Sequence, residues 1–477
     1  MEVSSVLNNS RSFYHIKQKK LDSIVGIEFI IKNSVKKSLQ EVNMIKEFFR
    51  YAVPSALAMF ISSLYTVIDG IFVGQGVGDT ALASVNIVLP FTVMLFGLAS
   101  MFAIGGGALV SKNIGAKNID RAVNIFRQVF KFLLIISGII SIICIVFTEQ
   151  IVTVLGATET LKELSVQYLR FYAIFCIPNL IGIVLSSFVR NDGRPKLAMV
   201  STIAGAITNI ILDYVFIFNL GLGIKGAAIA TGLGQIITVG ILLPHFIMKK
   251  GYLTFGNVKI NRNDLKEFSL IGFPSFFAQA SYSLMVLIHN IVLVKFIGEM
   301  GISAYSIINY ITTNTYMVLY GLTLGVQPLI SYNYGRKDGH KMLKFFNITC
   351  VSSLTVSVAF ILISFLFGKS LIGIFTQDPV ILNLAYTALR IASVSYIVVG
   401  LNLNTLVYFQ AIERPKYSNL SCLLRSAIYL PICLLVLYKI FGNNGIWAGT
   451  IASESLTFIT ISIISNIKTS TKEAIAA

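Results

Sequence analysis

The segment NIILDYVFIFNLGLGIKGAAIAT, residues 209–231, contains two apolar runs joined by a short Gly-rich turn. Each run continues beyond the segment to roughly 20 residues or more, the length of a helix that crosses a hydrocarbon core of about 30 Å. We therefore expect two antiparallel membrane-spanning helices. Asn209 and Asp213 are spaced to share one face of the first helix, and Thr231 lies at a similar depth in the second. A carboxylate inside such a helix is rarely kept without a partner or a function.

The composition agrees with an all-α protein that spans the membrane many times. Of 477 residues, 55% are hydrophobic and 12% are charged, and the mean hydropathy is +0.78. The apolar runs are too long for the strands of a barrel and do not alternate. The net charge of +17 comes from Lys and Arg residues that fall mostly in alternate loops. That pattern indicates membrane topology, so we expect no nucleic-acid partner.

Sequence motifs argue against an enzyme. The cysteines all lie in apolar runs without metal-ligand spacing: Cys144, Cys176, Cys350, Cys422 and Cys433. Nothing resembles an ATP-binding loop, a zinc-hydrolase motif or a nucleophile elbow. We therefore expect no cofactor, no disulfide and no metal beyond a transported Na⁺.

Twelve spans are predicted, and a repeat divides them into two lobes. The spans lie at about 48–73, 82–110, 122–147, 161–189, 197–218, 226–248, 268–297, 302–333, 343–367, 380–412, 417–440 and 445–467. A shift of about 220 residues aligns KEFFRYAVPS (46–55) with KEFSLIGFPS (266–275), and LVSKNIGAKN (109–118) with LISYNYGRKD (329–338). Parallel six-helix repeats imply a pseudo-two-fold axis along the membrane normal and a cleft between two lobes, which is typical of transporters.

The predicted organisation follows from the repeat and from the basic loops. It comprises a cytoplasmic tail (1–43), a first lobe (44–248), an inter-lobe loop (249–265), a second lobe (266–467) and a second tail (468–477). Lys and Arg gather in the loops after the even spans, which places those loops and both termini in the cytoplasm. Since the repeat begins near Met44, residues 1–43 either form a tail, with an amphipathic surface helix as an alternative, or precede the natural start.

Intramembrane acids are concentrated in the first lobe. Only Asp69, Asp213 and Glu454 lie well inside predicted spans. The repeat shift maps Asp69 to His289 and Asp213 to Cys433, so the second lobe lacks the acids. Asp69, Asn209, Asp213 and Thr231 together supply the hard oxygens that a proton or Na⁺ prefers. Glu454 aligns with Gln235 and is as consistent with a structural role as with a further acid for transport.

With these residues, the region from about Met44 to Ile467 resembles the multidrug and toxic compound extrusion (MATE) family. The resemblance rests on the Pro54–Asp69 spacing with IDGIFVG, on the N-x-x-x-D of Asn209 and Asp213, on Thr231 and on the duplicated lobes. It is greatest for the prokaryotic branch with acids in the amino-terminal lobe. The resemblance implies a coupling-ion site at Asp69, Asn209, Asp213 and Thr231.

Other residues are candidates for a bend point in a helix or for the lining of a substrate cavity. Pro54 removes a backbone donor from the helix that carries Asp69 and so predicts a bend point. A pocket for flat cations could be lined by aromatic and adaptable side chains, although most such residues in a span simply pack: Met59, Tyr65, Tyr282, Met285, His289, Tyr316 and Tyr320.

The predicted function is a monomeric antiporter of the cell membrane that exports amphipathic, mostly cationic compounds in exchange for H⁺ or Na⁺. Within transport, a flippase or metabolite exporter of the same superfamily is the alternative, favoured by an arginine-lined cleft. Only Arg425 lies well inside a second-lobe span, however, so the several arginines that would favour this alternative are missing from the sequence. A membrane enzyme, and a scaffold or sensor that does not transport, are the alternatives of other classes.

Overall fold

The computed structural model describes residues 41–466. The chain divides into two units, Met1–Phe49 and Arg50–Ala477. Of the first unit, residues 41–49 are described as the start of a helix, in which the rings of Phe48 and Phe49 meet edge-on with centroids 5.2 Å apart. The C-terminal tail and nearly all of the N-terminal tail predicted from the sequence lie outside the described residues.

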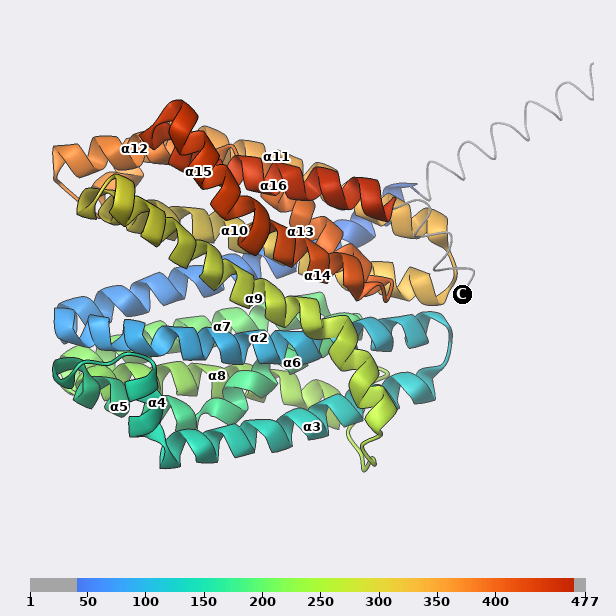
Figure 1. Ribbon diagram of the computed structural model, residues 1–477. Coiled ribbons are helices and arrows are strands. Elements are labelled where there is room, and N and C mark those ends of the chain that lie inside the picture. Colours follow the sequence, from blue (N-terminus) through green and yellow to red (C-terminus); the bar gives the residue numbers. More distant parts are fainter. Residues whose placement is uncertain (1–40, 467–477) are drawn as a thin grey trace, which may run out of the picture. The chain divides into compact units, whose positions relative to one another are not determined.

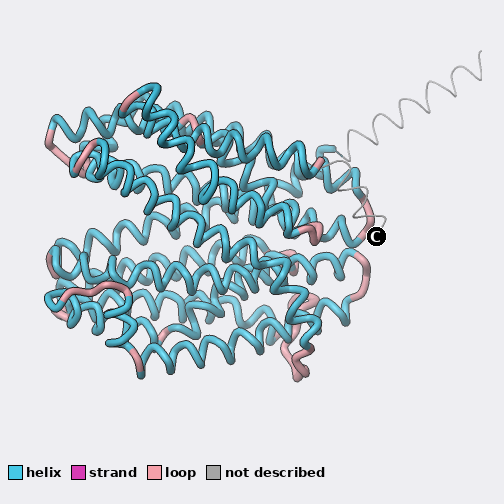
Figure 2. The backbone as a smooth tube through the Cα atoms, viewed as in Figure 1, coloured by secondary structure: helices cyan, strands magenta, loops and turns pink. Residues whose placement is uncertain are grey.

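The described chain consists of helices and loops (Figures 1 and 2). The first repeat comprises a first helix (Glu41–Gly76), α2 (Asp79–Gly115), α3 (Ile119–Val146), α4 (Thr148–Val154), α5 (Glu159–Ile174), α6 (Cys176–Asn191), α7 (Pro195–Tyr214) and α8 (Gly223–Ile247). The second comprises α9 (Arg262–Phe296), α10 (Glu299–Gly335), α11 (Gly339–Gly373), α12 (Pro379–Ser393), α13 (Tyr396–Ala411), α14 (Pro415–Leu423), α15 (Tyr429–Phe441) and α16 (Asn443–Ser465).

Most of the predicted spans correspond to apolar helices long enough to cross a membrane. Nine described helices, or eleven if each bent pair counts as one span, meet that description. The remaining predicted span is α10, whose sequence is rich in Ser, Thr, Asn and Tyr. It is as long as its repeat counterpart α2, at 37 residues each. The helical membrane fold with two repeats is therefore confirmed.

Four of the spans are irregular in ways that the sequence analysis did not predict. The spans α5–α6 and α12–α13 are bent by 53° and 46°. Two other spans contain a turn of π-helix, Val215–Asn219 directly after α7 and Leu424–Ile428 between α14 and α15. Turns of this kind are frequent at functional sites. The first follows Asp213 almost at once, and the second contains Arg425.

The two lobes contact each other mainly at one end, which we call the basic end. It carries the Lys- and Arg-containing connections 112–121, 190–197, 248–261, 335–341 and 411–417. There Lys112 Nζ donates to Glu413 Oε2 at 2.7 Å across the lobes. Toward the opposite end, the last hydrogen bond between the lobes within residues 50–466 joins Ser63 Oγ to Asn314 Oδ1 at 2.6 Å.

Two glycines at the basic end let the backbones of the two lobes come into direct contact. A Cβ on Gly115 would overlap the carbonyl oxygen of Tyr332, and one on Gly335 would overlap that of Lys112. Gly115 and Gly335 occupy equivalent positions in the repeat, so one close contact is made twice about the pseudo-two-fold axis. At these two places the contact between the lobes is therefore made by main chain, and no side chain fits between the helices.

The connection between the lobes is ordered and packs on the first lobe. Arg127 donates from Nε to the Thr254 carbonyl at 2.8 Å, and Asp192 accepts from the Tyr252 amide at 2.9 Å. The first turns of α9 continue this packing, because Phe268 and Ile271 belong to the buried core of the first lobe. The start of α9 therefore packs with the first lobe although the repeat assigns it to the second.

Candidate functional site

Asp69 and Asp213 come together in the first lobe, as their predicted depth requires. Their carboxyl groups are close enough to influence each other electrostatically. Asp213 is fully buried, and neither of its oxygens has a hydrogen-bond donor among the described residues outside this pair. One oxygen of Asp69 is buried in the same way. Because a carboxylate has no hydrogen to donate, a hydrogen bond between the two groups requires a proton.

Asn209 and Thr231 complete the cluster from the neighbouring helix faces. Asn209 contacts Asp213 and donates from Nδ2 to Thr231 Oγ1 at 3.4 Å. Its amide oxygen is buried without a donor. The pairing depends on a close approach of α7 and α8, where a Cβ on Gly234 would come 2.7 Å from the Gly205 carbonyl oxygen. The site thus gathers several oxygens that can accept a proton or surround a small cation.

Two tyrosines stand next to the acids. Tyr65 and Tyr168 both interact electrostatically with Asp69 and Asp213. Tyr65, a predicted candidate for the substrate cavity, lies one helical turn before Asp69 on the first helix. Tyr168, on α5, was missed because nothing in the sequence places its helix next to the first helix. No basic side chain neutralises the two acids, since no Lys or Arg forms an ion pair with either of them among the described residues.

The equivalent place in the second lobe has no acid. Thr450 Oγ1 lies 3.2 Å from His289 Nε2, and His289 Nδ1 lies 2.8 Å from the Met285 carbonyl. The imidazole also stacks on Tyr305, with centroids 5.0 Å apart. Tyr429, the counterpart of Asn209, is hydrogen-bonded to Thr460. The second lobe therefore satisfies its polar groups internally where the first lobe leaves oxygens without donors.

Glu454 forms a buried ion pair with Arg425. Oε1 of Glu454 lies 2.5 Å from Nη2 of Arg425, and both side chains are buried. Asn402 donates to the other carboxylate oxygen at 2.6 Å. Asn402 was missed, because polar residues in spans are common and the sequence does not show which faces Glu454. The charges of Arg425 and Glu454 cancel, which supports a structural role for Glu454.

The remaining cavity candidates separate into two groups. Tyr282, Tyr316 and Tyr320 form a row of stacked rings, with successive centroids 5.8 and 6.0 Å apart. Met59 of the first lobe packs on the cluster that contains Tyr320. Met285 belongs to the core of the second lobe, and His289 is buried directly beside it. Of the predicted cavity residues, Tyr316 and Tyr320 thus pack with Met59 in a cluster drawn from both lobes, and Tyr282 extends the row within the second lobe.

Pro54 lies inside a continuous helix. The first helix runs from Glu41 to Gly76 without a break, and Pro54 is buried within it. The backbone around Pro54 is covered by α10, since a Cβ on Gly321 would come 2.7 Å from the Ser55 carbonyl oxygen. The predicted bend point is therefore located in an interface between the lobes.

Arg190 is a residue that the sequence analysis did not single out. It lies at the end of α6, one residue beyond the predicted span, yet it is only 9% exposed. Its Nη1 donates to Ser186 Oγ at 3.4 Å, and no carboxylate pairs with it among residues 41–466. Tyr320 of the other lobe is its electrostatic neighbour. A buried guanidinium without an acid partner among the described residues therefore lies at the end of α6, which contacts α10, the helix that carries Tyr316 and Tyr320.

The fold and the intramembrane polar cluster define a two-lobed helical membrane transporter. The MatE family model matches residues 54–215 and 274–435, so the two matches are offset as the repeat predicts. The chain belongs to the MatE family of transporters, and the resemblance inferred from the sequence is confirmed.

Relatives and solved structures agree over nearly the whole chain. Multidrug export protein MepA of Staphylococcus saprophyticus is 26% identical over 432 residues, 89% of this chain and 94% of the relative. MepA of Staphylococcus aureus is 25% identical over 422 residues, covering 88% and 93%. The crystal structure of MATE in the straight conformation has a TM-score of 0.85 at 24% identity and covers 90% of this chain and 97% of that one.

Proposed function

We propose that this transporter exports amphipathic, mostly cationic organic compounds in exchange for H⁺ or Na⁺. The staphylococcal relatives are named multidrug export proteins, and the alignment covers 93% or more of their length. Export of small organic compounds is therefore the function that the family relationship supports. The tyrosine row suits flat cations, since aromatic faces attract positive charge.

One observation carries the coupling proposal: the Asp69–Asp213 pair has buried oxygens with no donor. Two neighbouring carboxylates resist being ionised together, so the pair gains stability when it takes up a positive charge. A proton would form the hydrogen bond between the carboxyl groups. Na⁺ would instead take oxygens from both acids, from the Asn209 amide and from the Thr231 hydroxyl. Inward movement of one charge yields about 2.3 kcal/mol per 100 mV, enough to drive a conformational cycle.

The contacts between the lobes support alternating access with the basic end closed in this conformation. If the basic loops are cytoplasmic, as the positive-inside rule predicts, the acid pair lies toward the outer side. Cation uptake there would precede opening of the basic end, which must break the Lys112–Glu413 pair. With the basic end open, the cation would leave to the cytoplasm and a compound would enter from it. Return to the present conformation would then carry the compound outward.

The test is transport of a fluorescent cationic dye by the purified protein in proteoliposomes, with pH and Na⁺ gradients imposed separately. Asp69→Asn and Asp213→Asn should each lower gradient-driven export at least about tenfold, because the chain loses a group that binds the coupling cation. Cys433→Ser, at the repeat counterpart of Asp213, is the matched control and should export normally. Wild-type export by either acid variant would contradict the coupling role of that acid.

A second candidate function is export of compounds that carry an acidic group, and Arg190 is the observation that favours it. Arg425, the one arginine predicted well inside a second-lobe span, is neutralised by Glu454, whereas Arg190 has no acid partner among the described residues. Arg190→Gln should weaken export of an anionic or zwitterionic dye and leave a cationic dye unaffected or better exported. Equal effects on both dyes would argue against this candidate.

A further inference from the structure

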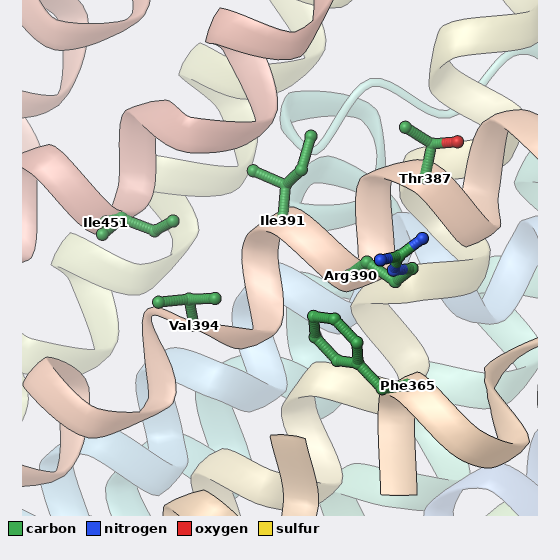
Figure 3. A pocket seen from close by; sticks show the side chains of 6 residues that line it. All are labelled: Phe365, Thr387, Arg390, Ile391, Val394 and Ile451. Carbon is green, nitrogen blue, oxygen red and sulfur yellow. The ribbon is translucent and has the colours of Figure 1, made fainter. Parts of the chain in front are cut away.

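A pocket on the second lobe lies apart from the acid pair and from the tyrosine row. Its volume is about 370 Å³, and it opens between α11, α12 and α16 at the bend between α12 and α13 (Figure 3). Phe365, Ile391, Val394 and Ile451 give it apolar walls, and Arg390 and Thr387 add polar groups. The pocket therefore combines an apolar groove with a cation.

The cation is unusual for a surface that faces a membrane. Arg390 is exposed, and its guanidinium lies over the rings of Phe365 and Tyr386, 4.8 and 5.7 Å from their centroids. Lys369 lies over the same Tyr386 ring from the other helix, at 5.4 Å. Neither cation forms an ion pair or a side-chain hydrogen bond with any of residues 41–466. One positive charge thus lines the groove and a second lies near it, at the shared Tyr386 ring, with no counter-charge among residues 41–466.

The position along the helices matches the level of lipid headgroups. At 1.5 Å per residue, Arg390 lies about 30 Å along the α12–α13 pair from Ala411 at the basic end. The hydrocarbon core is also about 30 Å thick, so Arg390 is expected at its opposite border. Tyr386 and Phe365 beside it agree with the aromatic belt of that border.

From the pocket, the unpaired cations and their depth, we infer that this groove binds an anionic phospholipid of the surrounding membrane. The phosphate and headgroup lie between Arg390 and Lys369, which supply charge-assisted hydrogen bonds. One acyl chain lies along Phe365, Ile391, Val394 and Ile451. Because the groove borders the bend between α12 and α13, the lipid also contacts a joint of the second lobe.

The first lobe provides a natural comparison. Arg170 is the repeat counterpart of Arg390 and is also exposed. However, the counterparts of Phe365 and Lys369 are Ile145 and Glu149, so the first lobe has an acid where the second has a second cation. An arginine at this place in the repeat is thus common to both lobes, whereas the groove with paired cations belongs to the second.

Lipid retention by the full chain tests the inference without any transport assay. The protein is reconstituted in vesicles of equal amounts of phosphatidylglycerol and phosphatidylcholine, extracted in mild detergent, and its bound lipid is quantified by mass spectrometry. The wild type should keep phosphatidylglycerol over phosphatidylcholine by roughly tenfold, given two cations near the surface. The double variant R390Q/K369Q should lose most of that preference, and R170Q should retain it.

Further arms separate the groove from general surface charge. Ile451→Trp fills the apolar part without changing charge, and it should also lower retention of phosphatidylglycerol. Soluble glycerophosphoglycerol, which has the headgroup but no acyl chain, should not displace the lipid. Undiminished preference in both R390Q/K369Q and I451W would overturn the inference, as would an equal loss in R170Q or displacement by the soluble headgroup. Melting temperatures in phosphatidylcholine alone identify any variant that is misfolded, and the remaining variants then decide.

Discussion

At the scale of single residues, two buried charged clusters behave in opposite ways. Glu454 has a cation and an amide donor within hydrogen-bonding distance, from Arg425 and Asn402. Asp213 is equally buried, and neither of its oxygens accepts a hydrogen bond among residues 41–466. The same kind of side chain is thus satisfied in one lobe and left available in the other.

This contrast predicts opposite effects on stability. Glu454→Gln should destabilise the protein by about 3–5 kcal/mol, because it leaves Arg425 as an uncompensated buried charge. Replacing both residues, as Arg425→Met with Glu454→Met, should recover most of the loss. Asp213→Asn should keep or raise stability. Thermal unfolding in detergent measures all three, and a Glu454→Gln variant as stable as wild type would show that Arg425 finds another partner.

Thr231→Val distinguishes the two coupling cations. Valine matches threonine in shape but removes the hydroxyl oxygen, which only Na⁺ would need as a ligand. If Na⁺ is the coupling cation, the Na⁺ concentration for half-maximal export should rise about tenfold; if H⁺ is, export should change little. Thr450→Val, at the equivalent place in the second lobe, is the control, and an equal effect there would mean that the hydroxyl serves packing.

The sequence showed which residue types matter at the site, and less well how they pair. Asp69 and Asp213 could be predicted because carboxylates in long apolar runs are conspicuous, and their spacing along the helices gives depth. Arg190 could not, since a basic residue at the end of a span normally reaches into water. Whether it turns inward depends on the packing of α6 against α10, which no local pattern records.

At the scale of elements, the spans followed from hydrophobic length, whereas their bends did not. The bend between α5 and α6 has a visible cause in Pro178, which cannot donate to the carbonyl of Ile174. The equivalent bend between α12 and α13 occurs with Val398 at that position. Proline is therefore not required for this bend, which both lobes share.

Pro54→Ala tests whether the first helix changes shape during transport. Alanine restores a backbone hydrogen bond and favours a straight helix, since proline inside a helix costs about 3 kcal/mol in soluble hosts and less in membranes. Turnover should fall several-fold while dye binding is kept. Pro274→Ala, at the equivalent place in α9, should be milder because that helix carries no acid. Equal defects would mean that both prolines serve only the fold.

At the scale of the whole molecule, the two lobes are held together through the basic end, and Glu413 makes that contact sensitive to pH. Glu413 lies between α13 and α14, outside the spans. Burial raises its pKa above the ordinary value although Lys112 opposes the shift. A state that exposes Glu413 would restore the ordinary pKa. Protonation of Glu413 therefore favours the closed basic end. This contribution to the stability of the closed state is fully present below the ordinary pKa of a glutamate, and it is lost as the pH rises through the raised pKa of the buried Glu413.

Spin labels at Ala116→Cys and Arg336→Cys, equivalent exposed positions on the two lobes, report the opening of the basic end. The fraction of molecules with a short distance between the two labels, which marks a closed basic end, should be larger at about pH 5 than at about pH 8. Glu413→Gln, which resembles the protonated side chain, should weaken that dependence and leave the part due to the acid pair. A pH dependence identical to wild type would exclude Glu413 as its source.

The main-chain contact of Gly115 and Gly335 with the opposite lobe has a consequence for the electrical tightness of the membrane. A pathway wide enough for a drug must hold back protons and ions between cycles, and a contact in which backbones touch leaves no space for a column of water at these two places. Because the contact occurs twice, a methyl group at either glycine would separate the backbones at only one of the two places. We expect proteoliposomes with Gly115→Ala or Gly335→Ala to lose an imposed pH gradient faster than wild type in the absence of any dye, and an unchanged rate of loss would show that other contacts close the pathway.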